Sequence, residues 1–328
     1  MSAIGFIDGE RQSQAAFFAR TIPAELINEV SAYRLKPGQH LLNLAPAIRT
    51  TAAAYFGAPR NIVWHRHANH GLSSQVCCLN FLMPLATQPV ILARWIEHTL
   101  GLDGLTILPP ADSAEHSSGL VAFEWTGLQD YLNEWPGNGK ATRGANATSA
   151  DAAVTFRHEG KTKTVLIEWK YTESYGQPLE PGGNATRAGR YRALMSAPNG
   201  PIRADAGVKL EDFFWEPLYQ LLRQQMLAWR MEQARENGAE EVSILHISPS
   251  RNRALHKVTS PRLKPFGDDV FAVFRSLLAT PGHFLSLTTE QAFGPLLALD
   301  DLDPAFREWA AYLSGRYRFL SMTLGHNG

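Results

Sequence analysis

Two acidic residues and one lysine near the middle of this 328-residue chain have the types and spacing of a hydrolytic site. Asp151 begins one apolar segment, and Glu168 and Lys170 end the next one, which starts at Thr164. The second segment combines β-branched and aromatic residues with a polar end, which predicts a strand. Residues two apart on a strand point to the same face, so Glu168 and Lys170 should project together. Two carboxylates and a lysine at strand ends can hold a divalent metal ion and position a water molecule, which is the chemistry of phosphodiester hydrolysis.

The spacing of the two segments predicts a hairpin. They cover about 151–157 and 163–171, and the turn at 158–161 contains Gly160, which suits a tight connection. In a hairpin the start of the first strand lies beside the end of the second, so we expect Asp151 close to Glu168 and Lys170. Mg²⁺ prefers oxygen ligands and would relieve the repulsion between two nearby carboxylates. The alternative is a set of ordinary solvated charges, because Glu-x-Lys is common at strand ends.

The elements around this site predict an α/β or α+β core with a central mixed sheet flanked by helices. Residues 73–248 show the order helix, strand, strand, strand, helix, strand. The expected regions are an N-terminal helical extension at 1–72, the core at 73–248 with a long irregular insertion at 172–209, and a C-terminal extension at 249–328 with three helices packed on the core. The expected core elements are a helix after Ser73 or Ser74, a helix at 89–100, a strand at 120–126, a loop at 136–148, a helix at 217–236 and a strand at 241–248.

Composition limits the partners and the compartment. Thirty-one basic and thirty-one acidic residues cancel, so net charge does not indicate a nucleic-acid partner, although a local basic groove can still form. Cys77 and Cys78 are the only cysteines and are adjacent, which fits a reducing compartment. The N-terminus lacks the pattern of a leader, and no apolar stretch reaches the roughly 18 residues of a membrane span. We therefore expect a cytoplasmic protein.

The element order, with Asp151 and Glu168-Trp169-Lys170 on adjacent strands, resembles the PD-(D/E)XK nuclease superfamily. Segments 73–85, 148–153, 168–175 and 216–225 resemble a bacterial family of restriction endonucleases within it. Ala150 stands where the superfamily's name has proline. The resemblance implies a restriction-endonuclease-like core in which Asp151, Glu168 and the backbone carbonyl of Trp169 bind Mg²⁺ or Mn²⁺.

The resemblance also implies that polar residues on the following helix face the site. Gln220 and Gln224 are four apart and share a helix face, whereas Gln225 points elsewhere. The alternative is that these glutamines are good helix formers on a wet surface. Gln75 is a weaker candidate, for which a cap-region or buried hydrogen bond is the alternative.

Several other polar residues have two interpretations. His65, His67 and His70 have the spacing His-x-His-x-x-His, but no matched second cluster supports zinc, and a surface loop or a loop near the substrate groove is favoured. Glu173 and Tyr175 follow the catalytic strand and would shape the site entrance. Two groups of arginines could bind DNA phosphates or could lie in ordinary solvated loops. The first is Arg187, Arg190 and Arg192, with Tyr191 among them, and the second is Arg251 and Arg253, followed by Lys257.

The predicted function is a metal-dependent DNA endonuclease, restriction-like or defence-related. Because double-strand cleavage often needs two active sites, we expect a homodimer. The alternative is a non-catalytic nucleic-acid-binding or scaffold protein with the same fold, favoured by the neutral charge and the lack of a DNA-reading motif. A third hypothesis is a hydrolase of another phosphate ester. Both carboxylates should converge beside Lys170 in a nuclease, whereas a splayed, solvent-facing triad would favour the non-catalytic protein.

Overall fold

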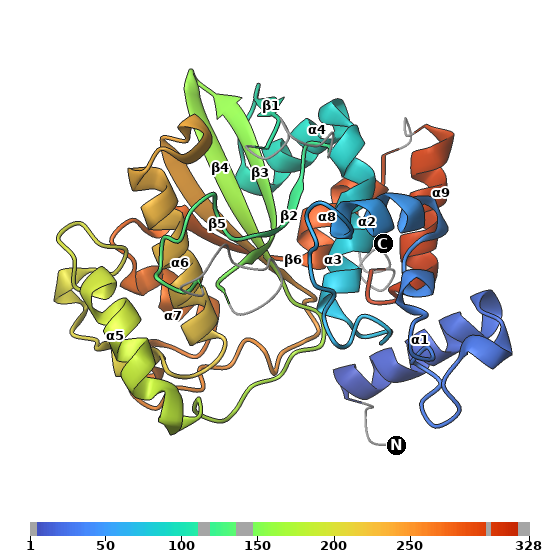
Figure 1. Cartoon of the computed structure of the whole chain (residues 1–328), viewed down its shortest axis with the longest axis horizontal. Coiled ribbons are helices and arrows are strands. Elements are labelled where there is room, and N and C mark those ends of the chain that lie inside the picture. Colours follow the sequence, from blue (N-terminus) through green and yellow to red (C-terminus); the bar gives the residue numbers. More distant parts are fainter. Residues whose placement is uncertain (1–4, 111–118, 136–146, 300–302, 321–328) are drawn as a thin grey trace, which may run out of the picture.

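A mixed β-sheet lies at the centre of the molecule (Figure 1). The computed structural model describes residues 5–110, 119–135, 147–299 and 303–320. In this part of the chain the strand order is β1-β3-β4-β5-β6, and β2 pairs with β3 on the same edge as β1. The strands are β1 (Thr106–Leu108), β2 (Ala122–Trp125), β3 (Ala150–His158), β4 (Lys161–Trp169), β5 (Glu241–Ser248) and β6 (Phe284–Thr288).

The hairpin β3–β4 forms as predicted. Its two loop residues, Glu159 and Gly160, have φ values of 49° and 77°. Positive φ at both positions matches the right-handed twist of the strands, and glycine adopts it without steric cost. β1, β2 and β4 each pair with β3 in antiparallel orientation. β4, β5 and β6 run parallel to one another. The parallel pairs need crossover connections, which contain helices α6 (Leu218–Gln233) and α7 (Val270–Leu277).

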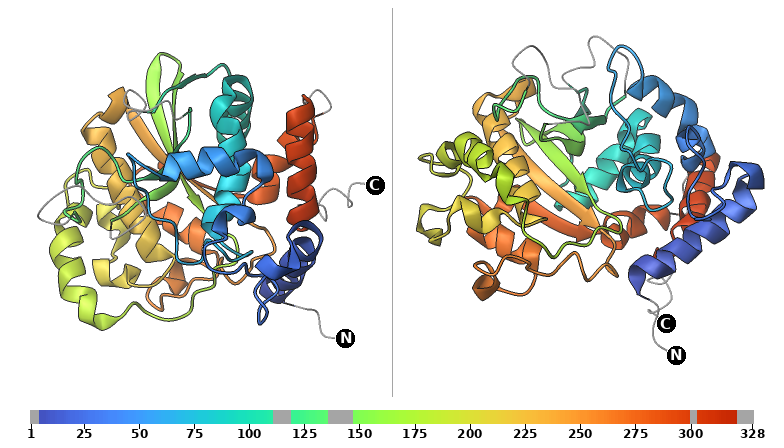
Figure 2. Two further views of the ribbon diagram at one scale, coloured as in Figure 1. Left: turned by 45° about the vertical axis from the view of Figure 1, so that its right-hand side comes forward. Right: turned by 60° about the horizontal axis from the view of Figure 1, so that its bottom comes forward.

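Two hydrophobic cores cover the two faces of the sheet, because side chains alternate along each strand. On β4, Val165, Ile167 and Trp169 pack into one core and Leu166 into the other. The first face is covered by α2 (Arg49–Phe56), α3 (Ser74–Leu82), α4 (Pro89–Leu100), α8 (Thr289–Leu297) and α9 (Pro304–Arg316), and the second by α5 (Asn184–Met195), α6 (Leu218–Gln233) and α7 (Val270–Leu277) (Figures 1 and 2). Helix α1 (Phe6–Thr21) packs against α9 at one end of the molecule.

The predicted mixed sheet with flanking helices is confirmed, and the core elements follow the predicted order α3, β2, β3, β4, α6, β5. The description of 172–209 as irregular is wrong for 184–195. Helix α5 forms there, between proline- and glycine-rich flanks that dominate the composition of the segment. The C-terminal region contains the three expected helices and also β6, which pairs with β5. The expected loop at 136–148 lies almost entirely outside the described residues.

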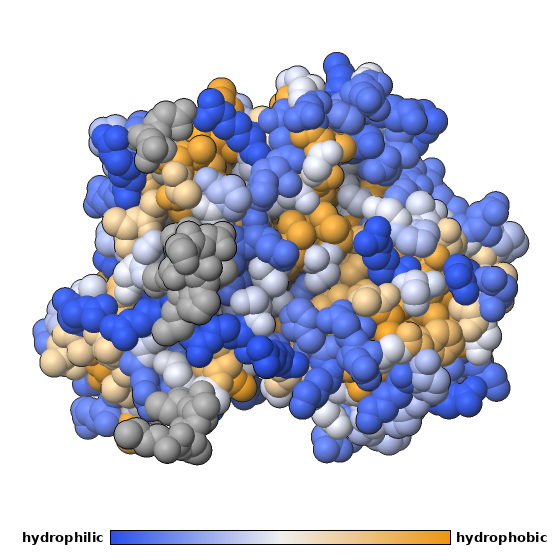
Figure 3. Space-filling view, turned by 180° about the vertical axis from the view of Figure 1, so that it is seen from behind, coloured by the Kyte–Doolittle hydropathy of each residue, from blue (hydrophilic) through white to orange (hydrophobic). Residues whose placement is uncertain are grey.

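The surface is largely hydrophilic, with hydrophobic areas interspersed on the face seen from behind (Figure 3). Large exposed hydrophobic side chains in the described ranges, such as Val30, Val90 and Phe266, are far apart in the sequence. Scattered residues of this kind are normal on a protein surface. Among the helices that the structure describes, none combines the length and apolar character needed to cross a bilayer.

Candidate active site

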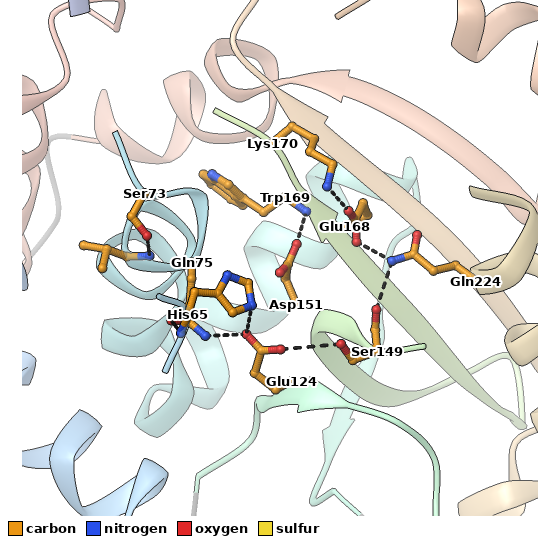
Figure 4. Close-up of polar contacts among 11 residues, drawn as sticks. His65, Ser73, Gln75, Glu124, Ser149, Asp151, Glu168, Trp169, Lys170 and Gln224 are labelled. Carbon is orange, nitrogen blue, oxygen red and sulfur yellow. Dashed lines mark hydrogen bonds and ion pairs between the residues drawn. The ribbon is translucent and has the colours of Figure 1, made fainter. Parts of the chain in front are cut away.

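The structure brings Asp151, Glu168 and Lys170 together where β3 and β4 diverge (Figure 4). The hydrogen-bonded ladder of β3 and β4 ends at Ala152 and Ile167, one step before Asp151 and Glu168. Beyond that point the backbone N–H of Trp169 donates a hydrogen bond to Oδ2 of Asp151, at 2.7 Å. A side-chain carboxylate thus accepts a backbone donor that the ladder no longer pairs, and this places Asp151 beside the Glu-x-Lys segment.

Glu168 and Lys170 form a buried ion pair. Nζ of Lys170 lies 2.6 Å from Oε1 of Glu168, and the two residues are 8% and 1% exposed, respectively. Burial alone would lower the pKa of Lys170, but the negative charge of Glu168 and the other acidic groups around it outweigh burial and raise the pKa well above its usual value. The ammonium therefore stays charged in the interior, where it can offset negative charge. As predicted, Trp169 points to the opposite face, into the core beside Phe81.

Helix α6 presents two glutamines to this pair. Nε2 of Gln224 donates hydrogen bonds to Oε2 of Glu168 and, at 3.1 Å, to the carbonyl oxygen of Ser149. Oε1 of Gln220 accepts a 2.8 Å hydrogen bond from Nζ of Lys170. The shared helix face predicted for these glutamines is therefore the face that meets the site. Gln225 is also buried but makes neither contact.

Negative charge accumulates around Asp151. Burial raises the pKa of Asp151 well above its usual value, and the charges of Glu168 and Glu124 raise it further, while Lys170 and the Trp169 N–H oppose the shift. A bound cation would relieve this repulsion. Oδ1 of Asp151 makes no hydrogen bond with the described residues. Oε1 of Glu168 is buried and pairs with the charge of Lys170, but it has no hydrogen-bond partner in the described part of the chain, so both carboxylates retain free lone pairs.

The residues present fit a hard cation such as Mg²⁺. No group of three or more His, Cys, Asp or Glu side chains in the described part of the chain is placed to hold a metal. A metal here would therefore depend on Asp151 and Glu168, completed by the carbonyl of Trp169, water and substrate oxygens. Mg²⁺ is usually bound in this way, by one or two carboxylates with waters and phosphates.

Glu124 on β2 is a site residue that the sequence analysis missed. Its neighbours Phe123 and Trp125 pair with Ala152 and Ala150 of β3, which places Glu124 across from Asp151. The side chain of Glu124 is almost fully buried. Nε2 of Gln75 donates to its Oε1 at 2.7 Å, so Gln75 makes the buried hydrogen bond that was weighed as its alternative role. In the sequence, an acidic residue inside the otherwise apolar run 120–125 was the feature that could have identified Glu124 as a site residue.

The three histidines contact different partners. Nε2 of His65 lies 3.6 Å from Oε1 of Glu124, whereas Nε2 of His67 accepts a 3.0 Å hydrogen bond from Arg66. Nδ1 of His70 accepts from the backbone N–H of Leu72, and burial together with nearby positive charge lowers the pKa of His70 to about 4. His65 alone of the three therefore reaches the acidic site.

Glu173 and Tyr175 lie beyond Lys170. Oε2 of Glu173 accepts a 2.6 Å hydrogen bond from the backbone N–H of Tyr171, which holds the turn after β4. Tyr175 is half-buried, and burial raises the pKa of its hydroxyl to about 12, with Lys170 opposing the shift. Both residues thus border the lysine side of the site.

The five arginines proposed for DNA contact lie on two separate segments. Arg187, Arg190 and Arg192 are on α5, where Arg187 packs over the rings of Phe214 and Tyr219 and Arg192 pairs with Glu211. Tyr191 is buried and donates a hydrogen bond to Glu134. Arg251 and Arg253 are exposed in the loop after β5. Their role in binding DNA stays a prediction.

A protein-family model matches most of the chain. The family is described as Restriction Endonuclease associating with ARP, and the match covers residues 11–318. It includes every residue of the site described above. No curated protein and no solved structure gave a significant match.

Proposed function

Because the chain belongs to this family of restriction endonucleases, we propose that it is a metal-dependent DNA endonuclease of the PD-(D/E)XK type. The observation that supports this most directly is the convergence of Asp151, Glu168 and Lys170 at the diverging ends of β3 and β4. A splayed triad facing solvent would have favoured a non-catalytic protein instead.

Each residue of the site has a distinct part in this proposal. Asp151 and Glu168, with the carbonyl of Trp169, would hold Mg²⁺ or Mn²⁺. When bound, such an ion stabilises charge on the phosphate and lowers the pKa of a water molecule. Lys170 donates a hydrogen bond to the attacking water and offsets negative charge as it develops on the phosphate.

The two glutamines position these groups. Gln224 holds one carboxylate oxygen of Glu168 and ties it to the start of β3 through Ser149. Gln220 holds the ammonium of Lys170 from the same helix. Since both glutamines lie on one rigid helix, the distance between the carboxylate and the ammonium is set by the docking of α6 on the sheet.

Plasmid cleavage with Mg²⁺ or Mn²⁺ tests the proposal. Asp151→Asn and Lys170→Met should each reduce the rate by at least about 100-fold, because the first weakens the proposed metal site and the second removes a charge that acts on the reacting phosphate. Lys163→Met is the matched control, since Lys163 lies on the same strand but pairs with Glu241 at 3.1 Å. Cleavage that persists in both site variants would refute the site. DNA binding by the wild type without any cleavage would support the non-catalytic alternative.

A further inference from the structure

Glu124 extends the row of acidic residues across a third strand. The pairs on either side of Glu124 place it across from Asp151 of β3. Asp151 also lies one step beyond the end of the β3–β4 ladder, across from Glu168. Like charges on directly opposite strand positions destabilise a sheet. Glu124 also has a φ of 52°, which is strained for a residue with a side chain. An acid kept at this position despite both costs has a role beyond packing.

Gln75 fixes Glu124 relative to His65 (Figure 4). Its Nε2 donates to Oε1 of Glu124 at 2.7 Å, and its Oε1 accepts the backbone N–H of His65 at 3.0 Å. One buried amide thus ties the carboxylate to the segment that carries the imidazole. The imidazole Nε2 faces Glu124 at 3.6 Å, a distance within range of ionic attraction but longer than a hydrogen bond.

The imidazole of His65 is accessible to substrate. The side chain is 40% exposed, whereas that of Glu124 is 3% exposed. Nδ1 of His65 makes no hydrogen bond with any residue in the described ranges, so it can act as a donor. A buried carboxylate behind an exposed imidazole orients the ring and its outer nitrogen, as in other acid–base pairs.

His65 and Lys170 lie on opposite sides of Asp151. β2 and β4 flank β3 in the sheet, and Figure 4 shows His65 and Glu124 on one side of Asp151 and Lys170 on the other. With strands about 4.8 Å apart, β2 and β4 are roughly 10 Å apart, with β3 and Asp151 between them. Lys170 and the His65–Glu124 pair can therefore approach a phosphate held over Asp151 from opposite sides. In phosphoryl transfer the attacking and leaving oxygens lie roughly in line. If Lys170 orients the attacking water, the leaving oxygen falls on the side of His65.

We propose that His65, held by Glu124, protonates the leaving sugar oxygen when the DNA strand is cut. This assignment rests on the proposed nuclease function. The water oxygen forms a bond to phosphorus, and the bond from phosphorus to the sugar oxygen breaks with its electron pair on that oxygen. The oxygen takes the proton from Nδ1 of His65. The attacking water releases a proton to solvent, and the imidazole regains one from solvent, so the net reaction is hydrolysis.

DNA with sulfur in place of the leaving oxygen tests the assignment, because a thiolate leaves without a proton. The wild type first maps the cut position and the ends it produces on a natural duplex. A matched duplex then carries the bridging sulfur at that bond. His65→Gln should cut the natural duplex about 100-fold or more slowly, the usual contribution of a general acid, and should cut the sulfur duplex within about threefold of wild type. Glu124→Gln should also slow cleavage of the natural duplex more than cleavage of the sulfur duplex, but by a smaller factor than His65→Gln.

Two controls separate this role from a structural one. His67→Gln removes a neighbouring exposed imidazole, which contacts Arg66, and should cut both duplexes at the wild-type rate. Lys170→Met should reduce the cleavage rate of both duplexes, because Lys170 acts on the attacking water and not on the leaving oxygen. Thermal unfolding of His65→Gln should match wild type, since the side chain is partly exposed.

The outcomes are distinct. If the wild type is active and His65→Gln reduces the cleavage rate of both duplexes by the same factor, the assignment is overturned. That result would indicate that His65 only binds the phosphate. Wild-type rates for His65→Gln on the natural duplex would overturn it as well. A wild type that cuts no DNA would refute the nuclease function itself, and the proton-donor role with it.

Discussion

Gln224→Met provides a direct test of how the site is held together. Gln224 is 1% exposed, and its amide nitrogen donates to the Glu168 carboxylate and to the carbonyl of Ser149. Methionine has a similar volume and shape, so the change leaves little cavity. It removes both hydrogen bonds, including the amide donor to the buried Glu168 carboxylate, which then keeps only its ion pair with Lys170.

The magnitude follows from the two bonds. A hydrogen bond to a charged group contributes about 1.5–3 kcal/mol and a neutral one about 0.5–1.5 kcal/mol. The two bonds together contribute about 2–4.5 kcal/mol, and loss of the buried Oε1 of Gln224, which is unpaired among the described residues, offsets part of this, so Gln224→Met should lower the free energy of unfolding by about 1–3 kcal/mol. In a Glu168→Gln background the charge is absent, so the same change should cost less, and the difference measures the coupling between the two side chains.

Urea denaturation with a metal chelator present measures both values without interference from bound ions. Gln225→Met is the matched control, because Gln225 is adjacent on α6 and 3% exposed. Its Oε1 has no hydrogen-bond partner within the described residues, so its replacement should be neutral or stabilising. Equal effects of the two substitutions, or no coupling to Glu168, would refute the hydrogen-bonded arrangement.

Three further outcomes are expected. Burial, with repulsion from Glu168 and Glu124, raises the pKa of Asp151 well above its usual value, so the native state loses stability as pH rises from the unfolded pKa toward the folded pKa. The stabilisation by Asp151→Asn should therefore grow as pH rises above about 4, and urea midpoints of the two proteins that converge with rising pH would contradict this. Mg²⁺ should raise the Tm of the wild type but not of Asp151→Asn, as measured by thermal unfolding, because an ion that binds only the native state stabilises it; equal shifts would place the ion elsewhere. Arg316→Met should lower the free energy of unfolding by about 3 kcal/mol or more, because the fully buried guanidinium bonds Gln14, Tyr312 and Asn43; an unchanged urea midpoint would show that this network contributes little.

Local backbone geometry was enough to predict part of the site. Glu168 and Lys170 share a face because a strand has a period of two, and Gln220 and Gln224 share a face because a helix repeats every 3.6 residues. Gly160 identified the hairpin turn, and the hairpin brought Asp151 to the other two charged residues. These relations connect residues that are close in sequence, so they depend little on the rest of the fold.

The long-range elements were harder to predict. Helix α5 was missed because glycine and proline dominate the composition of 172–209, and β6 was missed because a short strand is recognised mainly by the partner it pairs with. The buried Arg316 reads in sequence as an ordinary charge on a helix. Its burial results from the packing of α9 against α1 and the segment around Asn43.

Glu124 shows where sequence reasoning stopped at the site itself. Its position opposite Asp151 depends on the register between β2 and β3, and its inward orientation depends on a positive φ. Neither property is encoded in the spacing of residues along the chain. The pairing of strands that are distant in sequence therefore decided that Asp151 has an acidic neighbour on each side, and that one of them has a histidine within reach.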